Sequence, residues 1–204
     1  DYKEWFKLRY FPMATIGKFN GVVKEARENY VIDKWIGFDF VLDIDNKFDD
    51  FREGMPYILD VCKQIQELIK ERFHYWFVFS GTGVQLRINY ETLDKKIIQN
   101  EIKEDRDFKK IITILGTWLI KNIEPKHENV KLEFFTDIVR FTALPFAPYR
   151  KTWKNRAICV PFRDYKQFSL EYTKPENVFK VWEKTIYSHE NEPKLSYDLY
   201  MESK

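Results

Sequence analysis

Two carboxylates stand close together near residue 44, at the end of a run in which apolar residues alternate. The apolar residues of this run are Ile36, Phe38, Phe40, Leu42 and Ile44. Because successive side chains of a strand point to opposite faces, we expect Asp39, Asp43 and Asp45 to lie together on the face away from the core. Like charges at this spacing repel, and a divalent cation between them would convert the repulsion into coordination. A solvated edge strand that uses acidic residues against aggregation has the same pattern, so the pair alone leaves both interpretations open.

Charge is unevenly distributed along the chain, although the formal net charge is only +2. Residues 138–163 include no acidic residue and six basic ones, which are Arg140, Arg150, Lys151, Lys154, Arg156 and Arg163. Tyr149 and Trp153 lie among them, and basic side chains interleaved with aromatic rings suit a phosphate backbone with stacked bases. Acidic residues dominate at 39–53. The chain therefore offers one patch for cations and one for phosphates, although either run taken singly is typical of a solvated face.

A short glycine-containing turn, Ser80-Gly81-Thr82-Gly83, separates two apolar segments. Its glycines allow positive φ and close backbone approach, so its amides and the hydroxyl of Ser80 could hold a phosphate. A hairpin would accept the same glycines for steric reasons. The turn is neither a P-loop nor a dinucleotide-binding motif, because no helix follows it and no Gly-Lys-Ser/Thr is present.

Hydrophobic periodicity predicts the elements that position these residues. We expect strands at 35–45, 75–79, 84–89, 131–135 and 157–162, and helices at 56–73, over 94–122 as one or two helices, and at 175–187. Pro56 is expected at the first position of its helix. A strand, a helix and a strand followed by a returning strand imply an α/β sheet with at least one helix packed across it.

Length and composition set the wider limits. We expect one domain over residues 1–204, with an aromatic packing segment at 1–30 and a loosely ordered tail at 191–204. Cys62 and Cys159 have no metal-site spacing, which excludes a cysteine-rich zinc site and indicates buried thiols. No apolar stretch approaches the length of a membrane span, so we expect a soluble, cytoplasmic protein with no membrane partner.

Three motifs occur in an order that resembles the archaeo-eukaryotic primase superfamily. They are the acidic strand Phe40-Val41-Leu42-Asp43-Ile44-Asp45, the segment Ser80-Gly81-Thr82-Gly83-Val84-Gln85, and Asp137 followed by Leu144-Pro145 and Lys151-Thr152. In that family the signatures are a hydrophobic strand ending in Asp-x-Asp or Asp-x-Glu, then Ser-Gly-x-Gly-x-His, then an aspartate on a later strand. The likeness covers roughly residues 38–152. It implies an α/β (α+β) fold in which helices flank a mixed, largely antiparallel sheet of the RRM-like palm type.

The resemblance also implies a function and a site. The function is that of a template-directed nucleotidyltransferase, a DNA primase or primase-polymerase that joins nucleoside triphosphates on single-stranded DNA, with a helicase or a second primase subunit as a partner. Its catalytic and metal-binding residues are Asp43, Asp45 and Asp137, for two divalent Mg²⁺ or Mn²⁺ ions. Its nucleotide-binding residues are Ser80, Gly81, Gly83, Gln85, Arg140 and Lys151. The basic run adds candidates for contacts with nucleic acid, namely Arg150, Trp153, Lys154 and Arg156.

Two alternatives remain beside this interpretation. Gln85 stands where the family signature has histidine, and it can donate hydrogen bonds but carries no charge. Ala143, Ala147 and Tyr149 also depart from the residues frequent in the family. These departures favour a catalytically weak nucleic-acid-binding module of a replication or defence complex. A nuclease or a cyclase on a related palm-like sheet would use paired carboxylates as well.

Overall fold

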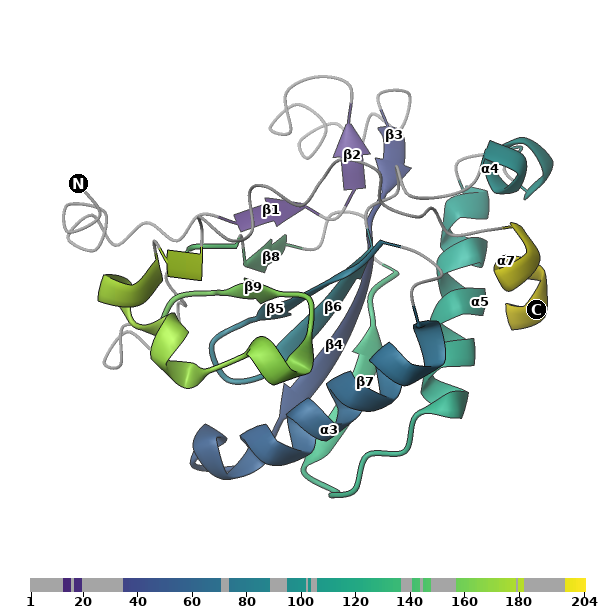
Figure 1. Cartoon of the computed structure of the whole chain (residues 1–204). Helices are drawn as coiled ribbons and strands as arrows, with labels where there is room; N and C mark the ends of the chain where they lie inside the picture. The colour runs from purple at the N-terminus through teal and green to yellow at the C-terminus, as the bar shows by residue number, and fades with distance from the viewer. Residues whose placement is uncertain are drawn as a thin grey trace.

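The computed structural model describes residues 13–15, 17–19, 35–70, 74–88, 95–101, 103, 106–136, 141–143, 145–147, 157–178, 180–181 and 197–204 (Figure 1). Its strands are β1 (Met13–Thr15), β2 (Gly17–Phe19), β3 (Trp35–Phe38), β4 (Phe40–Asn46), β5 (Trp76–Phe79), β6 (Val84–Ile88), β7 (Val130–Phe134), β8 (Phe141–Ala143) and β9 (Pro161–Phe162). Its helices are α3 (Phe51–Ile69), α4 (Lys95–Glu101), α5 (Arg106–Asn122) and α7 (Tyr197–Ser203), with 3-10 turns η3 (Tyr165–Gln167), η4 (Leu170–Thr173) and η5 (Pro175–Asn177).

The main sheet has five strands in the order β7-β4-β6-β5-β9, and all of its pairs are antiparallel. Strands β4 and β5, which α3 connects, are separated by β6. The connection β4-α3-β5-β6-α5-β7, with α4 preceding α5, is the split β-α-β-β-α-β arrangement. The expected combination of helices with a largely antiparallel sheet is therefore confirmed. Within the described residues, β1 pairs with β8 and β2 pairs with β3 in two smaller sheets.

Helices α3 and α5 pack on the same face of the main sheet (Figure 1). The ring of Phe51 in α3 contacts that of Phe79 in β5, with 6.1 Å between ring centroids. A Cβ on Gly116 of α5 would lie 2.4 Å from the Phe134 ring of β7, so that helix approaches the strand closely. The core forms between these helices and the apolar side chains of β4, β5 and β6, including the fully buried Leu42 and Ile44.

Several expected boundaries were wrong, for local reasons. The expected strand 35–45 divides at Asp39, because β3 pairs with β2 whereas β4 joins the main sheet. Helix α3 begins at Phe51 rather than Pro56, because the Asp50 side chain accepts a hydrogen bond from the Arg52 N–H and caps it. Pro56 lies inside that helix, which buries an apolar face over its whole length.

Four further expectations need correction or division. The stretch 94–122 forms two helices, α4 and α5, one of the two arrangements expected. Of the expected strand 157–162, only Pro161–Phe162 is a strand. Residues 197–203 of the expected loose tail form α7, in which the Tyr200 side chain is fully buried. The last expected helix starts as η5 and continues at 178 and 180–181, and residues 182–187 lie outside the described part of the chain.

Candidate functional site

Asp43 and Asp45 lie on the sheet face opposite to α3 and α5, as their alternation with Leu42 and Ile44 predicts. The strand register pairs Asp43 with Gln85 of β6 on one side and with Glu133 of β7 on the other. Directly opposite residues of antiparallel strands have Cα atoms about 4.5–5.5 Å apart. We call this side of the sheet the polar face, defined by Asp43, Asp45, Gln85, Arg87 and Glu133. The first and second sequence motifs therefore meet there.

Gln85 and Arg87 form a hydrogen-bonded pair on the polar face. The Arg87 Nη2 atom donates to Gln85 Oε1 at 2.6 Å, and the Gln85 side chain is buried. Burial lowers the pKa of the Arg87 guanidinium, whereas the charges of Asp39 and Asp43 act in the opposite direction. An arginine nevertheless stays protonated in a protein, so Arg87 places a positive charge beside Asp43. Sequence reasoning missed Arg87, although its spacing of two from Gln85 puts both side chains on one face.

Lys47 brings a second positive charge to the acidic end of β4. Its Nζ atom forms an ion pair with Asp45 Oδ2 at 2.5 Å. The hydrogen bond to Asp45 raises the pKa of Lys47, and the charges of Asp45, Asp43 and Glu133 raise it further against the lowering effect of desolvation. A cation at this position is therefore attracted by three carboxylates at once. Lys47 was also missed, because lysine next to aspartate is common on solvated surfaces.

The glycine turn closes the hairpin between β5 and β6. Phe79 pairs with Val84, and the Ser80 N–H donates to the Gly83 carbonyl oxygen at 3.0 Å. Gly81 has a φ of 106°, a conformation that L side chains rarely adopt. A Cβ on Gly83 would lie 2.4 Å from the Ile44 carbonyl oxygen of β4. Both glycines thus meet steric needs of the hairpin, and a contact with phosphate remains a prediction.

Asn46 joins the acidic strand to the glycine turn and to the start of α3. Its Nδ2 donates to the Thr82 carbonyl oxygen at 3.1 Å and to that of Phe51 at 2.8 Å. Its Oδ1 accepts from the Phe48 N–H at 3.2 Å. A Cβ on Gly54 would overlap the Asn46 amide group, so only glycine leaves room for it. Sequence reasoning missed Asn46, because its partners are 5 and 36 positions away along the chain.

The segment around the Leu144-Pro145 motif contacts residues 157–160, which lead to β9. The Phe146 N–H donates to the Cys159 carbonyl oxygen at 2.6 Å, and the Cys159 N–H donates to the Ala147 carbonyl oxygen at 2.8 Å. Burial raises the pKa of the Cys159 thiol to about 12, against the lowering effect of Arg87. Burial also raises the pKa of Cys62. Both cysteines are buried neutral thiols, as expected, and the effect of Arg87 on the pKa of Cys159 connects this segment electrostatically with the polar face.

Most of the other expected site residues lie outside the described residues. They are Asp137, Arg140, Arg150, Lys151, Trp153, Lys154 and Arg156. The described residues that precede Asp137 in the sequence lie beside β4, since the Phe135 N–H donates to the Val41 carbonyl oxygen at 3.1 Å. Of the expected residues that are described, Asp43, Asp45 and Gln85 lie on the polar face, and Ser80, Gly81 and Gly83 form the adjoining turn.

The acidic residues of the polar face fit a hard divalent cation by their chemistry. Carboxylate oxygens are the ligands that Mg²⁺ and Mn²⁺ prefer, and the ammonium of Lys47 already occupies a position favoured by three of them. Among the residues that the structure describes, no group of three or more His, Cys, Asp or Glu side chains is arranged to hold a metal ion. A complete site would therefore need a further ligand, the role expected of Asp137.

The chain matches no protein-family model and no curated protein sequence.

In the described part of the chain, no helix combines the length and the apolar character needed to cross a membrane.

Proposed function

We propose that this chain is the catalytic domain of a template-directed nucleotidyltransferase of the primase or primase-polymerase type. The observation that carries the proposal is the register of β4 and β6, which pairs Asp43 with Gln85 on the face away from α3 and α5. The same register brings the glycine turn against Ile44, next to Asp45. An acidic strand and a phosphate-binding turn need this proximity if both are to act on one nucleoside triphosphate.

The described side chains support distinct roles in such a reaction. Asp43 and Asp45, with Asp137, would hold two Mg²⁺ or Mn²⁺ ions, which when bound activate an attacking hydroxyl and neutralise charge on the transferred phosphate. The backbone of Gly81 and Gly83 would face the triphosphate, with Ser80 beside it. These roles require the polar face to admit a nucleotide between the carboxylates and the turn.

The hydrogen bond to Arg87 defines what Gln85 can offer a nucleotide. Because Gln85 Oε1 accepts from Arg87 Nη2, its Nε2 atom is left as a donor on the other side of the amide group. A phosphate oxygen or a sugar hydroxyl could accept from that atom. Gln85 would thus keep the hydrogen-bonding role of the histidine in the family signature without its positive charge.

Primer synthesis by the purified chain tests the proposal directly. With a single-stranded DNA template, labelled nucleoside triphosphates and Mn²⁺, we expect labelled oligomers that separate on a denaturing gel. Asp43→Asn and Asp45→Asn should each reduce product at least about 100-fold, because each removes a carboxylate charge that holds the divalent ions. Glu67→Gln provides the control, since Glu67 is exposed on α3 at the opposite side of the sheet. Equal product from all variants would refute the proposal.

A second candidate is a nucleic-acid-binding module with little catalytic activity. The contact that favours it is the ion pair between Lys47 and Asp45, which neutralises a carboxylate of the proposed metal site within the chain itself. The uncharged Gln85 favours it as well. This candidate predicts salt-sensitive binding of DNA with no metal-dependent incorporation of nucleotides, so the same preparation distinguishes the two.

A further inference from the structure

Strand β9 and the 3-10 turns that follow it lie at one edge of the main sheet (Figure 1). Residues of these elements line a cavity of about 580 Å³. We call it the edge pocket. Its aromatic lining residues are Trp76, Phe162, Phe168 and Tyr172, and its basic ones are Arg163, Lys166 and Lys180. None of the described residues that line it is acidic. Cavities of this size accommodate small organic ligands.

The floor of the edge pocket is an aromatic cluster continuous with the core. The rings of Phe162 and Phe77 stack with their centroids 5.4 Å apart. Phe168 contacts Phe162 at 4.7 Å and Phe79 at 5.5 Å. Because Phe77 and Phe79 are fully buried in the core, core packing fixes the position of the floor. It offers a rigid apolar surface to a planar ligand.

The wall of the edge pocket is a series of capped turns. The Asp164 side chain accepts from the Lys166 N–H at 3.0 Å and caps η3, and the Ser169 hydroxyl accepts from the Glu171 N–H at 3.3 Å and caps η4. The Ile158 N–H donates to the Thr173 carbonyl oxygen at 2.8 Å and connects the wall to the segment that leads to β9. The pocket therefore depends on several hydrogen bonds rather than on one loop conformation.

Two of the basic side chains, Lys166 and Lys180, contact neutral groups. Lys166 Nζ lies 5.8 Å from the centroid of the Tyr165 ring, and Lys180 Nζ donates to Asn177 Oδ1 at 3.2 Å. The nearby carboxylate of Glu171 forms its ion pair with Lys174 at 2.7 Å. Lys166 and Lys180 are both exposed. Their charges are thus available to an anion that enters above the aromatic floor.

We propose that the edge pocket binds one nucleotide unit of single-stranded DNA, with its base against the aromatic residues and its phosphates near Lys166 and Lys180. Aromatic rings beside cations are the usual means of holding a single strand. Trp76, which lines the pocket and pairs with Arg87 in the sheet register, lies two strand spacings, or about 10 Å, from β4. The choice of the DNA template as occupant rests on the proposed function. The aromatic and basic lining of the pocket is independent of that function.

The test measures DNA binding in the absence of catalysis. A fluorescent oligothymidylate of about 12 nucleotides, within the range of known single-strand sites, is titrated with the intact chain in EDTA without nucleoside triphosphates, and anisotropy is recorded at several salt concentrations. The double variant Lys166→Ala/Lys180→Ala should bind about tenfold more weakly, and its slope of log K against log salt should fall by about 1.4, which is 0.7 for each lost phosphate contact. Tyr172→Leu should weaken binding about fivefold or more through lost stacking, with its salt slope unchanged.

The control is Lys63→Ala/Lys121→Ala, which removes the same charge from exposed positions of α3 and α5. Equal losses of affinity and slope in both double variants would overturn the inference, as would binding of thymidine monophosphate as tight as that of the oligomer. If the pocket variants bind DNA as wild type does and still synthesise primers, the pocket proposal is rejected and the proposed function stands. If the pocket variants lose DNA binding and the wild-type chain incorporates no nucleotides, the proposed function is rejected and the pocket proposal stands.

Discussion

The position of Asp43 beside Gln85 depends on backbone register. Each side chain occupies the polar face because its strand alternates, and a slip of one residue would turn it toward α3 and α5. Close contacts hold this register beside the glycine turn. There the Gly83 backbone lies against the Ile44 carbonyl group, and the Asn46 side chain donates to the Thr82 carbonyl oxygen. The residues that position the candidate site are therefore distinct from those expected to perform chemistry.

Gly83→Ala tests this dependence on close contact. The added Cβ would meet the Ile44 carbonyl oxygen, which cannot move without disturbing β4. We expect a loss of about 1–3 kcal/mol in the free energy of unfolding, measured by urea denaturation. Thr82→Ala, which retains the carbonyl group bonded to Asn46, should change it by less than about 0.5 kcal/mol. Equal stabilities of the two variants would show that the turn can relax without cost.

At the residue scale, the sequence was informative where a local pattern determines the structure. Alternation predicted the shared face of Asp43 and Asp45, and glycine spacing predicted a turn with positive φ at Gly81. The contacts of Asn46 and Arg87 could not be predicted in this way. They depend on which strands become neighbours, and periodicity within one strand does not carry that information.

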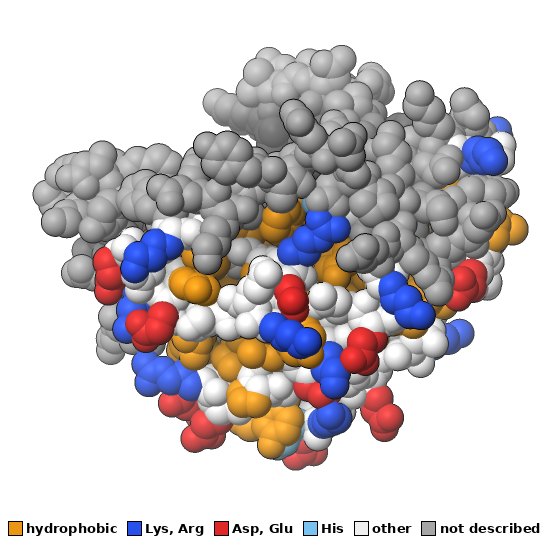
Figure 2. Space-filling model, in the orientation of Figure 1, with side chains coloured by type: hydrophobic (Ala, Val, Ile, Leu, Met, Phe, Trp, Pro, Cys, Tyr) orange, Lys and Arg blue, Asp and Glu red, His pale blue; other side chains and the backbone are white. Residues whose placement is uncertain are grey.

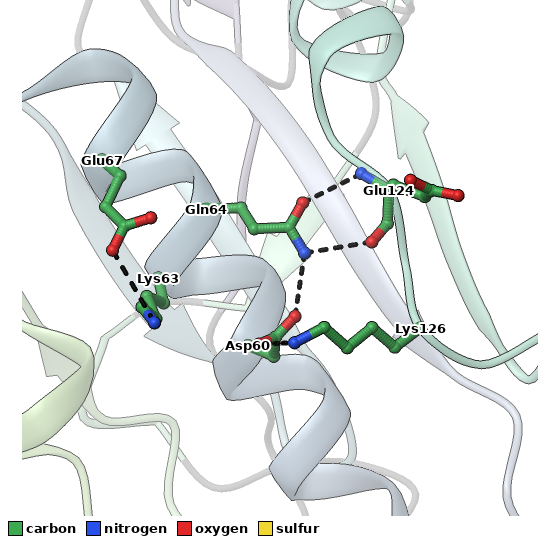
Figure 3. A network of polar contacts seen from close by, with 6 residues as sticks. All are labelled: Asp60, Lys63, Gln64, Glu67, Glu124 and Lys126. Atoms are coloured by element: carbon green, nitrogen blue, oxygen red, sulfur yellow. Dashed lines mark hydrogen bonds and ion pairs between the residues drawn. The ribbon is translucent and has the colours of Figure 1, made fainter.

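A network of polar contacts anchors helix α3 away from the candidate site (Figure 3). The Gln64 side chain bonds to both backbone groups of Glu124, accepting from its N–H at 2.9 Å and donating to its carbonyl oxygen at 3.0 Å. Asp60 accepts from Gln64 at 2.8 Å and forms an ion pair with Lys126 at 2.6 Å. This network joins α3 to the loop between α5 and β7. It therefore holds α3 to the segment that leads into β7.

Asp60→Asn should reduce stability in a pH-dependent way. The hydrogen bond from Lys126, with a further one from Gln64, lowers the pKa of Asp60 from 3.8. A carboxyl group with a lowered pKa stabilises the fold above its unfolded value and loses that contribution as pH falls through the folded value. We expect wild type to exceed the variant by about 0.5–1 kcal/mol at neutral pH.

The measurement is urea unfolding of both proteins from neutral pH down to about pH 3. The difference between them should shrink below pH 3.8, where the carboxyl group becomes protonated first in the unfolded chain. Glu67→Gln is a suitable comparison, since Glu67 is exposed and lies 3.8 Å from Lys63. A difference between wild type and Asp60→Asn that stays constant over this range would contradict the assignment of the stabilisation to the charge of Asp60.

Element types were easier to predict than element limits. The apolar face of α3 predicted a helix, but its start depends on the Asp50 cap, which lies before the apolar repeat. The strand expected at 35–45 was continuous in its alternation, and only the pairing of β3 with β2 divides it. Segment 157–160 is apolar like a strand, yet its backbone hydrogen bonds go to separate segments instead of forming a full ladder with one strand. Their partners are Phe79, Phe146, Ala147 and Thr173.

At the scale of the whole molecule, the two sides of the main sheet differ in character. The surface that carries α3 displays acidic and basic side chains interspersed, with no extended region of one sign among the described residues (Figure 2). The polar face instead carries carboxylates along β4 and β7, accompanied by three cations among the described residues. These are Arg87, Lys47 and Lys131, which lies opposite Asp45. This asymmetry is what a binding face opposite a structural face requires.

Sheet order is the feature of the whole molecule that sequence patterns could not provide. A strand, a helix and a strand are compatible with adjacent parallel strands, whereas here β6 inserts between β4 and β5. That insertion brings the second motif beside the first. The order of motifs along the chain therefore indicated one site, but only the strand order places Gln85 opposite Asp43.

The most direct test of the central claim is a crystal structure of the chain with Mn²⁺ and a nucleoside triphosphate. We expect anomalous manganese density about 2.1–2.3 Å from carboxylate oxygens of Asp43 and Asp45, with Asp137 completing the site and the triphosphate along the backbone of Gly81 and Gly83. Manganese bound away from the polar face, or Asp137 beyond coordination reach of both aspartates, would contradict the account.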